Sequence, residues 1–488
     1  MSDQQLVLLA IFLPFIGAIG IVLCRRWPNL REAVTLLTAA TVCTIVLAIY
    51  KRFLDGAYLA IDIAEPLPGL SIRFEVESLG MLFALVASVL WLITSIYSIG
   101  YMRKHQEKNQ TRFYAMFAIA IGSTLGVAFA GNLFSLFLWY EILTISTYPL
   151  VAHAGTDEAR RGARTYIGIL LGTSIGFLLL AILITYTVTG SLDFREGGIL
   201  AGKLDPAWAG LLYALFIFGI GKAAVMPFHR WLPAAMVAPT PVSALLHAVA
   251  VVKAGVFAIL KVTIYIFGTD FITSSGANDW LIWFAGSTIL LASIIAMTQN
   301  NLKLRLAYST VSQLSYIVLG ALLATNVSVL GGTLHIAMHA FAKITLFFAA
   351  GAILVAAHKS DISDMAGLGR AMPITFGAFL IGSLSIIGLP PFGGMWSKWY
   401  LSMGMIETGQ WLLLTVLLVS SLLNIAYLLP IPIRAFFAKA KDGTVHTEIK
   451  EAPASCLIAM MITSLACLLL FFYPDPFYEL ALSASGGK

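Results

Sequence analysis

Long apolar segments recur along this chain and leave few alternatives for its fold. A helix needs about 20 apolar residues to cross the hydrocarbon core of a bilayer, and such segments occur from residues 5–24 to residues 453–473. Hydrophobic residues make up 59% of the 488 residues and charged residues only 11%, too few to give a soluble protein its polar surface. The apolar runs are continuous and not alternating, which excludes membrane-spanning strands. We therefore predict an all-α polytopic membrane protein, and we exclude a soluble enzyme, a disordered chain and a nucleic-acid-binding module.

Fourteen segments are predicted to be transmembrane helices. Their approximate bounds are 5–24, 33–50, 78–101, 113–131, 132–151, 166–189, 207–228, 241–267, 280–299, 304–325, 328–357, 371–401, 410–433 and 453–473. The longest polar stretch, residues 434–452, is predicted to be a loop, and the loop at 51–77, with Pro66 and Pro68, is predicted to be irregular. Residues 1–488 are therefore expected to form a single transmembrane domain.

The distribution of positive charge predicts how the helices are oriented. If the N-terminus faces outward, the inner loops carry nineteen of the 30 lysines and arginines, and the outer segments carry six. Inner loops of membrane proteins are enriched in these residues. The asymmetry therefore predicts that both the N- and C-termini lie on the outer side.

Neither a cofactor site nor a metal site is expected. The four cysteines, Cys24, Cys43, Cys456 and Cys467, stand far apart without the spacing of a metal or cluster site. The chain has neither a Walker motif nor a glycine-rich dinucleotide motif nor a nucleophile elbow. We therefore expect no catalytic chemistry in this chain, and we expect an ion gradient or a partner subunit to drive it.

Nine ionisable side chains fall within the predicted spans. An ionisable group in a membrane helix is costly unless it is paired or hydrated, so it is a functional candidate by default. Lys261 lies near the outer end of its span, where we expect its amine to extend to the membrane surface. The remaining eight are Glu141, Lys222, His247, Lys253, His335, His339, Lys343 and Lys398.

Glu141 and Lys222 are candidates for a pair that exchanges a proton. Glu141 is the single carboxylate deep in a predicted span, and it serves either as a proton carrier or as half of a structural ion pair. Lys222 follows Gly219 and Gly221 and precedes Pro227, a sequence that predicts a broken helix of the kind that transporters use near the bilayer midplane. The alternative for Lys222 is an amine that extends to the inner surface.

A second group of candidates follows helical spacing. His335, His339 and Lys343 recur at i, i+4 and i+8, which places them on one face over about 12 Å of helix. Histidine exchanges protons near physiological pH, so this face is predicted to be a proton relay. Haem ligation is the weaker interpretation, because it needs histidines from facing helices and His247 is the only other deep histidine. His247 and Lys253 are six residues apart and cannot contact each other; His247 is either a hydrogen-bonded core residue or a relay group.

Lys398 follows a second predicted helix break. The sequence Leu-Pro-Pro-Phe-Gly-Gly at 389–394 must interrupt the twelfth span. Two broken helices with a lysine close to each break predict two inverted halves, at about 113–267 and 280–433. Residues 1–112 would then supply helices 1–3, and residues 434–488 would supply helix 14.

Several segments together resemble the antiporter-like subunits, the family of proton-conducting membrane subunits found in respiratory complex I, membrane-bound hydrogenases and Mrp cation/proton antiporters. These segments are 217–233 (IFGIGKAAVMPFHRWLP), 239–247 (PTPVSALLH), 309–316 (STVSQLSY), 339–343 (HAFAK) and 388–398 (GLPPFGGMWSK). The resemblance covers nearly the whole chain. It implies fourteen helices, two inverted five-helix repeats, broken helices 7 and 12, a hydrated axis of charged residues and an obligate larger complex.

The resemblance also implies roles for individual residues. Glu141 and Lys222 match the family's glutamate and lysine pair in helices 5 and 7. Lys253 with His247 matches the bridging position of helix 8, Lys343 with His339 matches the central relay of helix 11, and Lys398 matches the terminal group of helix 12. Chain length and the lysine pattern most resemble the D subunits of Mrp-type antiporters.

Two functions remain open on the sequence. The first is exchange of a monovalent cation, Na⁺, for H⁺ within an Mrp-type complex, and the alternative is proton pumping in a complex I-like or hydrogenase-type redox complex. A purely scaffolding role is disfavoured by the six deep charges. The expected partners are other membrane subunits, the lipid bilayer, protons and Na⁺, without nucleic acid, in the inner membrane of a prokaryotic cell.

Overall fold

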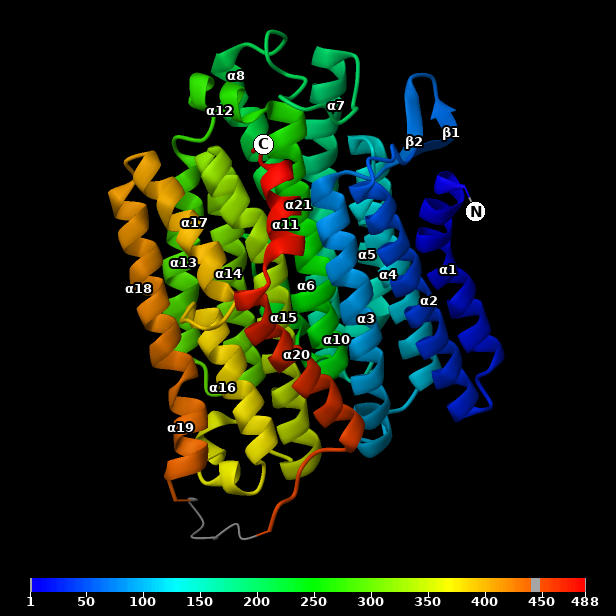
Figure 1. Ribbon diagram of the computed structural model, residues 1–488, viewed down its shortest axis with the longest axis vertical. Helices are drawn as coiled ribbons and strands as arrows, with labels where there is room; N and C mark the ends of the chain where they lie inside the picture. Colours follow the sequence, from blue (N-terminus) through cyan, green and yellow to red (C-terminus); the bar gives the residue numbers. More distant parts are fainter. Residues whose placement is uncertain (1, 440–447, 488) are drawn as a thin grey trace.

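A bundle of long helices makes up most of the protein (Figure 1). The computed structural model describes residues 2–439 and 448–487. Among these residues, twelve helical segments are long and apolar enough to cross a membrane. They are α1 (Asp3–Leu23), α2 (Pro28–Leu54), α3 (Ser78–Lys104), α4 (Gln110–Ala128), α5 (Leu133–Val151), α6 to α7 (Asp157–Thr189), α10 to η5 (Thr240–Phe267), α13 (Leu281–Thr298), α14 (Leu302–Leu323), α15 (Asn326–Ala357), α18 to α19 (Trp411–Phe437) and α20 (Ala454–Phe472).

Several of these segments contain short turns of a different helical type or a change of direction. The parts of the composite spans are α6 (Asp157–Thr173), η1 (Ser174–Leu178), α7 (Leu179–Thr189), α10 (Thr240–Ala244), η4 (Leu245–Val249), α11 (Val251–Val262), η5 (Thr263–Phe267), α18 (Trp411–Leu428) and α19 (Pro430–Phe437). Shorter elements are α8 (Pro206–Gly219), η2 (Gly221–Ala223), α9 (Trp231–Ala234), η3 (Ala235–Val237), α12 (Thr269–Ser275), η6 (Ile362–Asp364), η7 (Leu368–Arg370), α16 (Pro373–Ile387), α17 (Gly394–Glu407) and α21 (Asp475–Ala484).

The two predicted helix breaks are confirmed. α8 ends at Gly219, and after the single turn η2 the backbone turns left-handed at Ala224. α16 ends at Ile387, and Gly388 adopts a φ of 88° before α17 starts at Gly394. These interrupted helices cover the predicted spans 207–228 and 371–401, so every one of the fourteen predicted spans coincides with helix.

The loop at 51–77 is not irregular, and this prediction was wrong. β1 (Ala60–Leu67) pairs antiparallel with β2 (Leu70–Glu75). Gly69, with a φ of 78°, supplies the tight turn between them. Pro66 is compatible with the hairpin because a two-stranded sheet consists of edge strands alone. The hairpin lies at the same end of the bundle as both marked chain ends (Figure 1).

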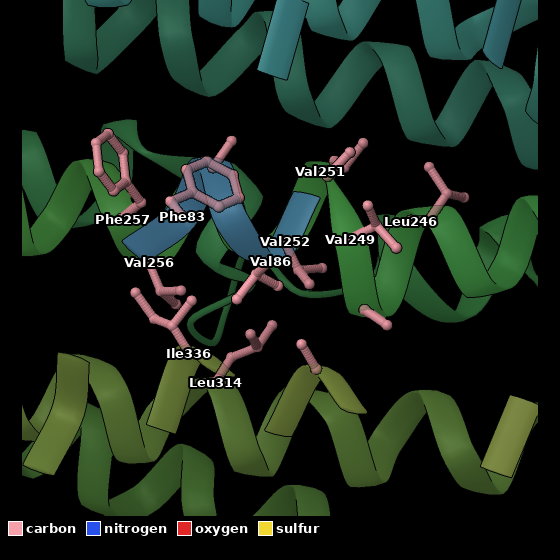
Figure 2. Close-up of a cluster of buried hydrophobic side chains, with 14 of the residues drawn as sticks. Phe83, Val86, Leu246, Val249, Val251, Val252, Val256, Phe257, Leu314 and Ile336 are labelled. Carbon is pink, nitrogen blue, oxygen red and sulfur yellow. The ribbon is translucent and has the colours of Figure 1, made fainter. Parts of the chain in front are cut away.

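The centre of the bundle is where α3, α11, α14 and α15 meet. Figure 2 shows Phe83 of α3 beside Phe257 of α11, with Leu314 and Ile336 contributed by α14 and α15. The rings of Phe83 and Phe257 lie 5.1 Å apart. The most apolar stretch of Thr240–Phe267 is completely buried, whereas two thirds of the corresponding stretch of α18 to α19 faces outward. Side chains on α11 and α15 therefore lie in the interior of the protein, away from lipid.

Candidate functional site

The eight predicted site residues are buried in the bundle. The seven basic side chains among them have relative exposures between 0% and 7%; they are Lys222, His247, Lys253, His335, His339, Lys343 and Lys398. Glu141 is partly exposed as a residue, but both of its carboxylate oxygens are buried. Positive charges in such a low-dielectric interior repel each other, so protonation at one site disfavours protonation at its neighbours.

Lys253 and His339 meet at the centre of the group. The amine of Lys253 on α11 lies 2.8 Å from Nδ1 of His339 on α15. The rings of His335 and His339 lie 5.7 Å apart, as their spacing of four residues on one helix requires. Nδ1 of His335 in turn contacts the hydroxyl of Ser397 on α17 at 2.7 Å. Basic groups from two helices are thus joined to a third through one hydroxyl.

Lys343 and His247 have different neighbours. Lys343 donates a hydrogen bond of 2.8 Å to the hydroxyl of Ser309 on α14. The ring of His247 packs 4.6 Å from that of Phe347, and neither of its nitrogens has a hydrogen-bond partner among the described residues. As expected from their spacing, His247 does not join Lys253, whose amine points to α15.

Lys222 and Glu141 lie near each other without forming an ion pair. Lys222 in η2 donates hydrogen bonds to the carbonyl oxygen of Tyr140, at 2.8 Å, and to the hydroxyl of Thr144, at 2.5 Å. Its amine also sits 3.0 Å from the centre of the Tyr140 ring. The two charges interact through space, but within the described part of the chain the oxygens of Glu141 have no hydrogen-bond partner. The structure therefore contains the separated arrangement of the predicted pair.

Lys398 lies at the second helix break. Its amine donates to the carbonyl oxygen of Ile387, the last residue of α16, at 2.9 Å, and to Ser421 of α18, at 3.0 Å. The last carbonyls of a helix lack intrahelical partners and carry partial negative charge, which favours a cation there. A cavity of about 520 Å³ between α16, α17 and α18 is lined by Lys398, Ser421 and otherwise largely apolar side chains.

Lys261 does not extend to the membrane surface, and that prediction was wrong. It is fully buried and forms an ion pair of 3.1 Å with Glu77. Glu77 caps the start of α3 through the amides of Leu79 and Gly80 and also accepts a hydrogen bond of 2.6 Å from Tyr265. Sequence reasoning missed this pair because the two residues are far apart in the chain. The available signal was an acidic residue directly before a predicted span.

Comparison with known protein families finds two matches. The family described as NADH:quinone oxidoreductase/Mrp antiporter, TM, matches residues 130–424. The family described as NADH-Ubiquinone oxidoreductase (complex I), chain 5 N-terminus, matches residues 68–114. The first match includes all eight predicted site residues.

Related proteins include both redox and antiporter components. NADH-quinone oxidoreductase subunit N of Desulforudis audaxviator is 33% identical over 410 residues, which is 81% of each chain. A Na(+)/H(+) antiporter component of Alkalihalophilus pseudofirmus is 30% identical over 444 residues, or 84% of this chain and 53% of the relative. The chain therefore spans about half the length of that antiporter component. One chain in the structure of the Mrp complex from Dietzia sp. DQ12-45-1b shares the fold, with a TM-score of 0.87 at 22% identity, over 100% of this chain and 97% of that one.

Proposed function

Because this chain belongs to the family of membrane subunits shared by NADH:quinone oxidoreductases and Mrp antiporters, we propose that it conducts protons for an Mrp-type exchange of Na⁺ against H⁺. It is a multi-pass, antiporter-like membrane subunit. The observation that carries the proposal is the direct contact of Lys253 with His339 in the buried centre of the bundle. Two basic groups that share one contact in a low-dielectric interior favour a single proton between them over two.

The proton path begins at the Glu141–Lys222 pair. In the separated arrangement Lys222 is held by Tyr140 and Thr144. When the pair closes, the carboxylate stabilises the charged amine, so opening and closing changes how readily Lys222 holds its proton. That change biases the neighbouring basic groups on α11 and α15 through their mutual repulsion.

The path continues through the central groups and ends at Lys398. Protons pass from Lys253 to His339, with His335, His247 and Lys343 as further carriers. Lys398 then releases the proton. Hard cations prefer sites with several oxygen ligands including carboxylates, and Glu141 is the single carboxylate in this path. We therefore assign proton transfer to this chain and the Na⁺ site to a neighbouring membrane protein of the same complex.

The alternative is a proton pump within a redox complex. It is favoured by the 33% identity to a quinone oxidoreductase subunit over 81% of both chains. The chemistry of the buried side chains is the same in both cases. The two functions differ in the source of free energy, which is a cation gradient in one case and electron transfer in a partner subunit in the other.

The test is purification of the intact complex through a tag on this chain, from its native membrane, followed by mass spectrometry and reconstitution into vesicles. An antiporter should contain small hydrophobic subunits, and an imposed Na⁺ gradient should change the internal pH. Lys253→Met keeps the length of the side chain and removes the amine, so it should lower this rate by roughly 100-fold. Lys203→Met, in an exposed loop, is the matched control.

Co-purified iron–sulfur or flavin subunits, together with proton uptake driven by a reductant and not by Na⁺, would replace the antiporter assignment with the redox alternative. Full transport in Lys253→Met would contradict the proposed path in either case.

A further inference from the structure

The span at 410–433 contains no ionisable residue, yet α18 turns a polar face inward. We define the polar face of α18 as Ser420, Ser421, Asn424 and Tyr427, which recur at i, i+1, i+4 and i+7 and so share one side of the helix. Ser420 and Asn424 are completely buried and Tyr427 nearly so. On its other side α18 exposes large apolar side chains such as Leu422. A lipid-facing helix with a buried polar stripe needs polar partners inside the bundle.

One end of the polar face is bonded to the partner of Lys343. The hydroxyl of Tyr427 lies 2.9 Å from Oγ of Ser309, the same oxygen that accepts a hydrogen bond from Lys343 at 2.8 Å. Tyr427 also forms a hydrogen bond with Oδ1 of Asn424 one turn earlier. Lys343 on α15 is thus connected through α14 to α18 by two hydrogen bonds.

The other end of the polar face is bonded to Lys398. The amine of Lys398 lies 3.0 Å from Oγ of Ser421 and 5.3 Å from the centre of the Tyr316 ring. The Tyr316 hydroxyl interacts with Ser421 and Asn424, but it completes no hydrogen bond of normal geometry within the described residues. The amide nitrogen of Asn424 is also buried without a partner there. Two unpartnered polar groups on facing helices provide donors and acceptors for a bridging water.

We propose that the polar face of α18 is the route by which protons pass between Lys343 and Lys398. The inference rests on the proposed function and identifies the groups that carry one step of it. Neither lysine contacts the other directly; each contacts a hydroxyl, Ser309 in one case and Ser421 in the other. The cavity of about 520 Å³ at Ser421 and Lys398 gives water access to this end of the route.

Each transfer conserves protons along the route. Protonated Lys343 gives a proton to Oγ of Ser309 as the hydroxyl proton of Ser309 passes to the Tyr427 oxygen. Tyr427 releases its own proton to a water held between Asn424 and Tyr316. That water passes a proton to Ser421, whose hydroxyl proton goes to the neutral amine of Lys398. At the end Lys343 has lost one proton and Lys398 has gained one, and the hydroxyls have only to rotate back.

A competing route exists along α15. His335 contacts Ser397, the residue directly before Lys398, at 2.7 Å. This route bypasses α18 completely. A hydroxyl can therefore be removed from either route without affecting the other.

The test compares single hydroxyl deletions in the purified complex reconstituted into vesicles. Tyr427→Phe should slow proton transport roughly tenfold or more and raise its H₂O/D₂O rate ratio, because the broken hydrogen-bond chain makes proton transfer rate-limiting. Asn424→Leu should slow it similarly. Tyr213→Phe is the matched control: its hydroxyl is equally buried and bonds Thr263 at 2.7 Å, away from the route. Recovery of the complex through the tag shows that each variant assembles.

The outcomes separate this proposal from the proposed function. If the wild-type complex transports protons, Lys253→Met does not, and Tyr427→Phe matches Tyr213→Phe in rate and isotope ratio, the α18 route is wrong and the proposed function stands. Loss of transport in Ser397→Ala with full transport in Tyr427→Phe would assign the step to the α15 route. If Lys253→Met also transports normally, the proposed function itself fails.

Discussion

Among the buried lysines, the chemistry of the contact partner distinguishes Lys261 from the rest. Lys261 has a carboxylate at 3.1 Å. Lys253, Lys343 and Lys398 contact an imidazole nitrogen, a hydroxyl and a carbonyl-hydroxyl pair. Removing the proton from Lys261 would leave a buried carboxylate without its counter-charge, whereas the other three can lose a proton without unpairing an acid. Lys261 is therefore suited to holding helices together, and the others are suited to exchanging protons.

Glu77→Gln should destabilise the protein without stopping proton transfer through the central groups. The amide keeps the shape of the side chain but leaves Lys261 buried opposite a neutral group. Breaking a buried pair in this way costs about 3 kcal/mol, near the low end of the usual range because Glu77 is partly exposed. Thermal unfolding of the purified complex measures the loss.

The double variant Glu77→Gln with Lys261→Met is the control for that prediction. It removes both charges, so it should recover part of the stability lost in the single variant. If Glu77→Gln unfolds at the wild-type temperature, the ion pair does not hold α3 to α11.

At the level of helices and strands, the two breaks determine where lysines can sit. Gly388 ends α16 with a left-handed backbone, and this directs the chain so that Lys398 lies against the end of the helix it follows. A β-carbon at Gly388 would lie only 2.8 Å from Cδ of Lys398. The position therefore requires glycine both for its backbone conformation and for the space that the lysine occupies.

Gly388→Ala should displace Lys398 and slow proton transport, in addition to a backbone cost of about 1 kcal/mol. Gly409→Ala is a matched control, because Gly409 also has a left-handed backbone, with a φ of 68°, but has open space where a β-carbon would be. Both variants should unfold at slightly lower temperature, and only Gly388→Ala should transport slowly. Equal transport rates in the two would show that the position of Lys398 does not matter.

The same elements show what the sequence could and could not predict. The spans were predictable because bilayer thickness sets helix length, and the breaks were predictable because glycine and proline cannot continue a helix. The hairpin at Ala60–Leu67 and Leu70–Glu75 was missed because its prolines were weighed more heavily than its turn glycine. Ser309 and Tyr427 were missed because a hydroxyl in an apolar span carries no charge to draw attention. Which hydroxyl faces which lysine depends on how distant helices pack, and periodicity within one helix does not contain that information.

At the scale of the whole molecule, the buried ionisable groups extend across the bundle. They run from α5, which carries Glu141, through α11 and α15 to α17, which carries Lys398, and α5 and α17 lie on opposite sides in Figure 1. The seven basic groups greatly outnumber the one acid. A charge change at Glu141 therefore shifts the balance of repulsion along the whole row, which makes this residue the point where the first step is controlled.

Glu141→Gln tests this control by removing the charge and keeping the volume. Its carboxylate oxygens have no hydrogen-bond partner among the described residues, so the amide should break no contact and the complex should assemble normally. Without the carboxylate, Lys222 loses the counter-charge that stabilises its protonated form on closure, and Na⁺-driven proton transport should fall roughly 100-fold. Glu158→Gln, at the exposed start of α6, is the control and should transport like the wild type. If Glu141→Gln transports at the control rate, Lys222 exchanges its proton without a carboxylate, and the first step must be assigned to Tyr140 and Thr144, the groups that hold its amine in this structure.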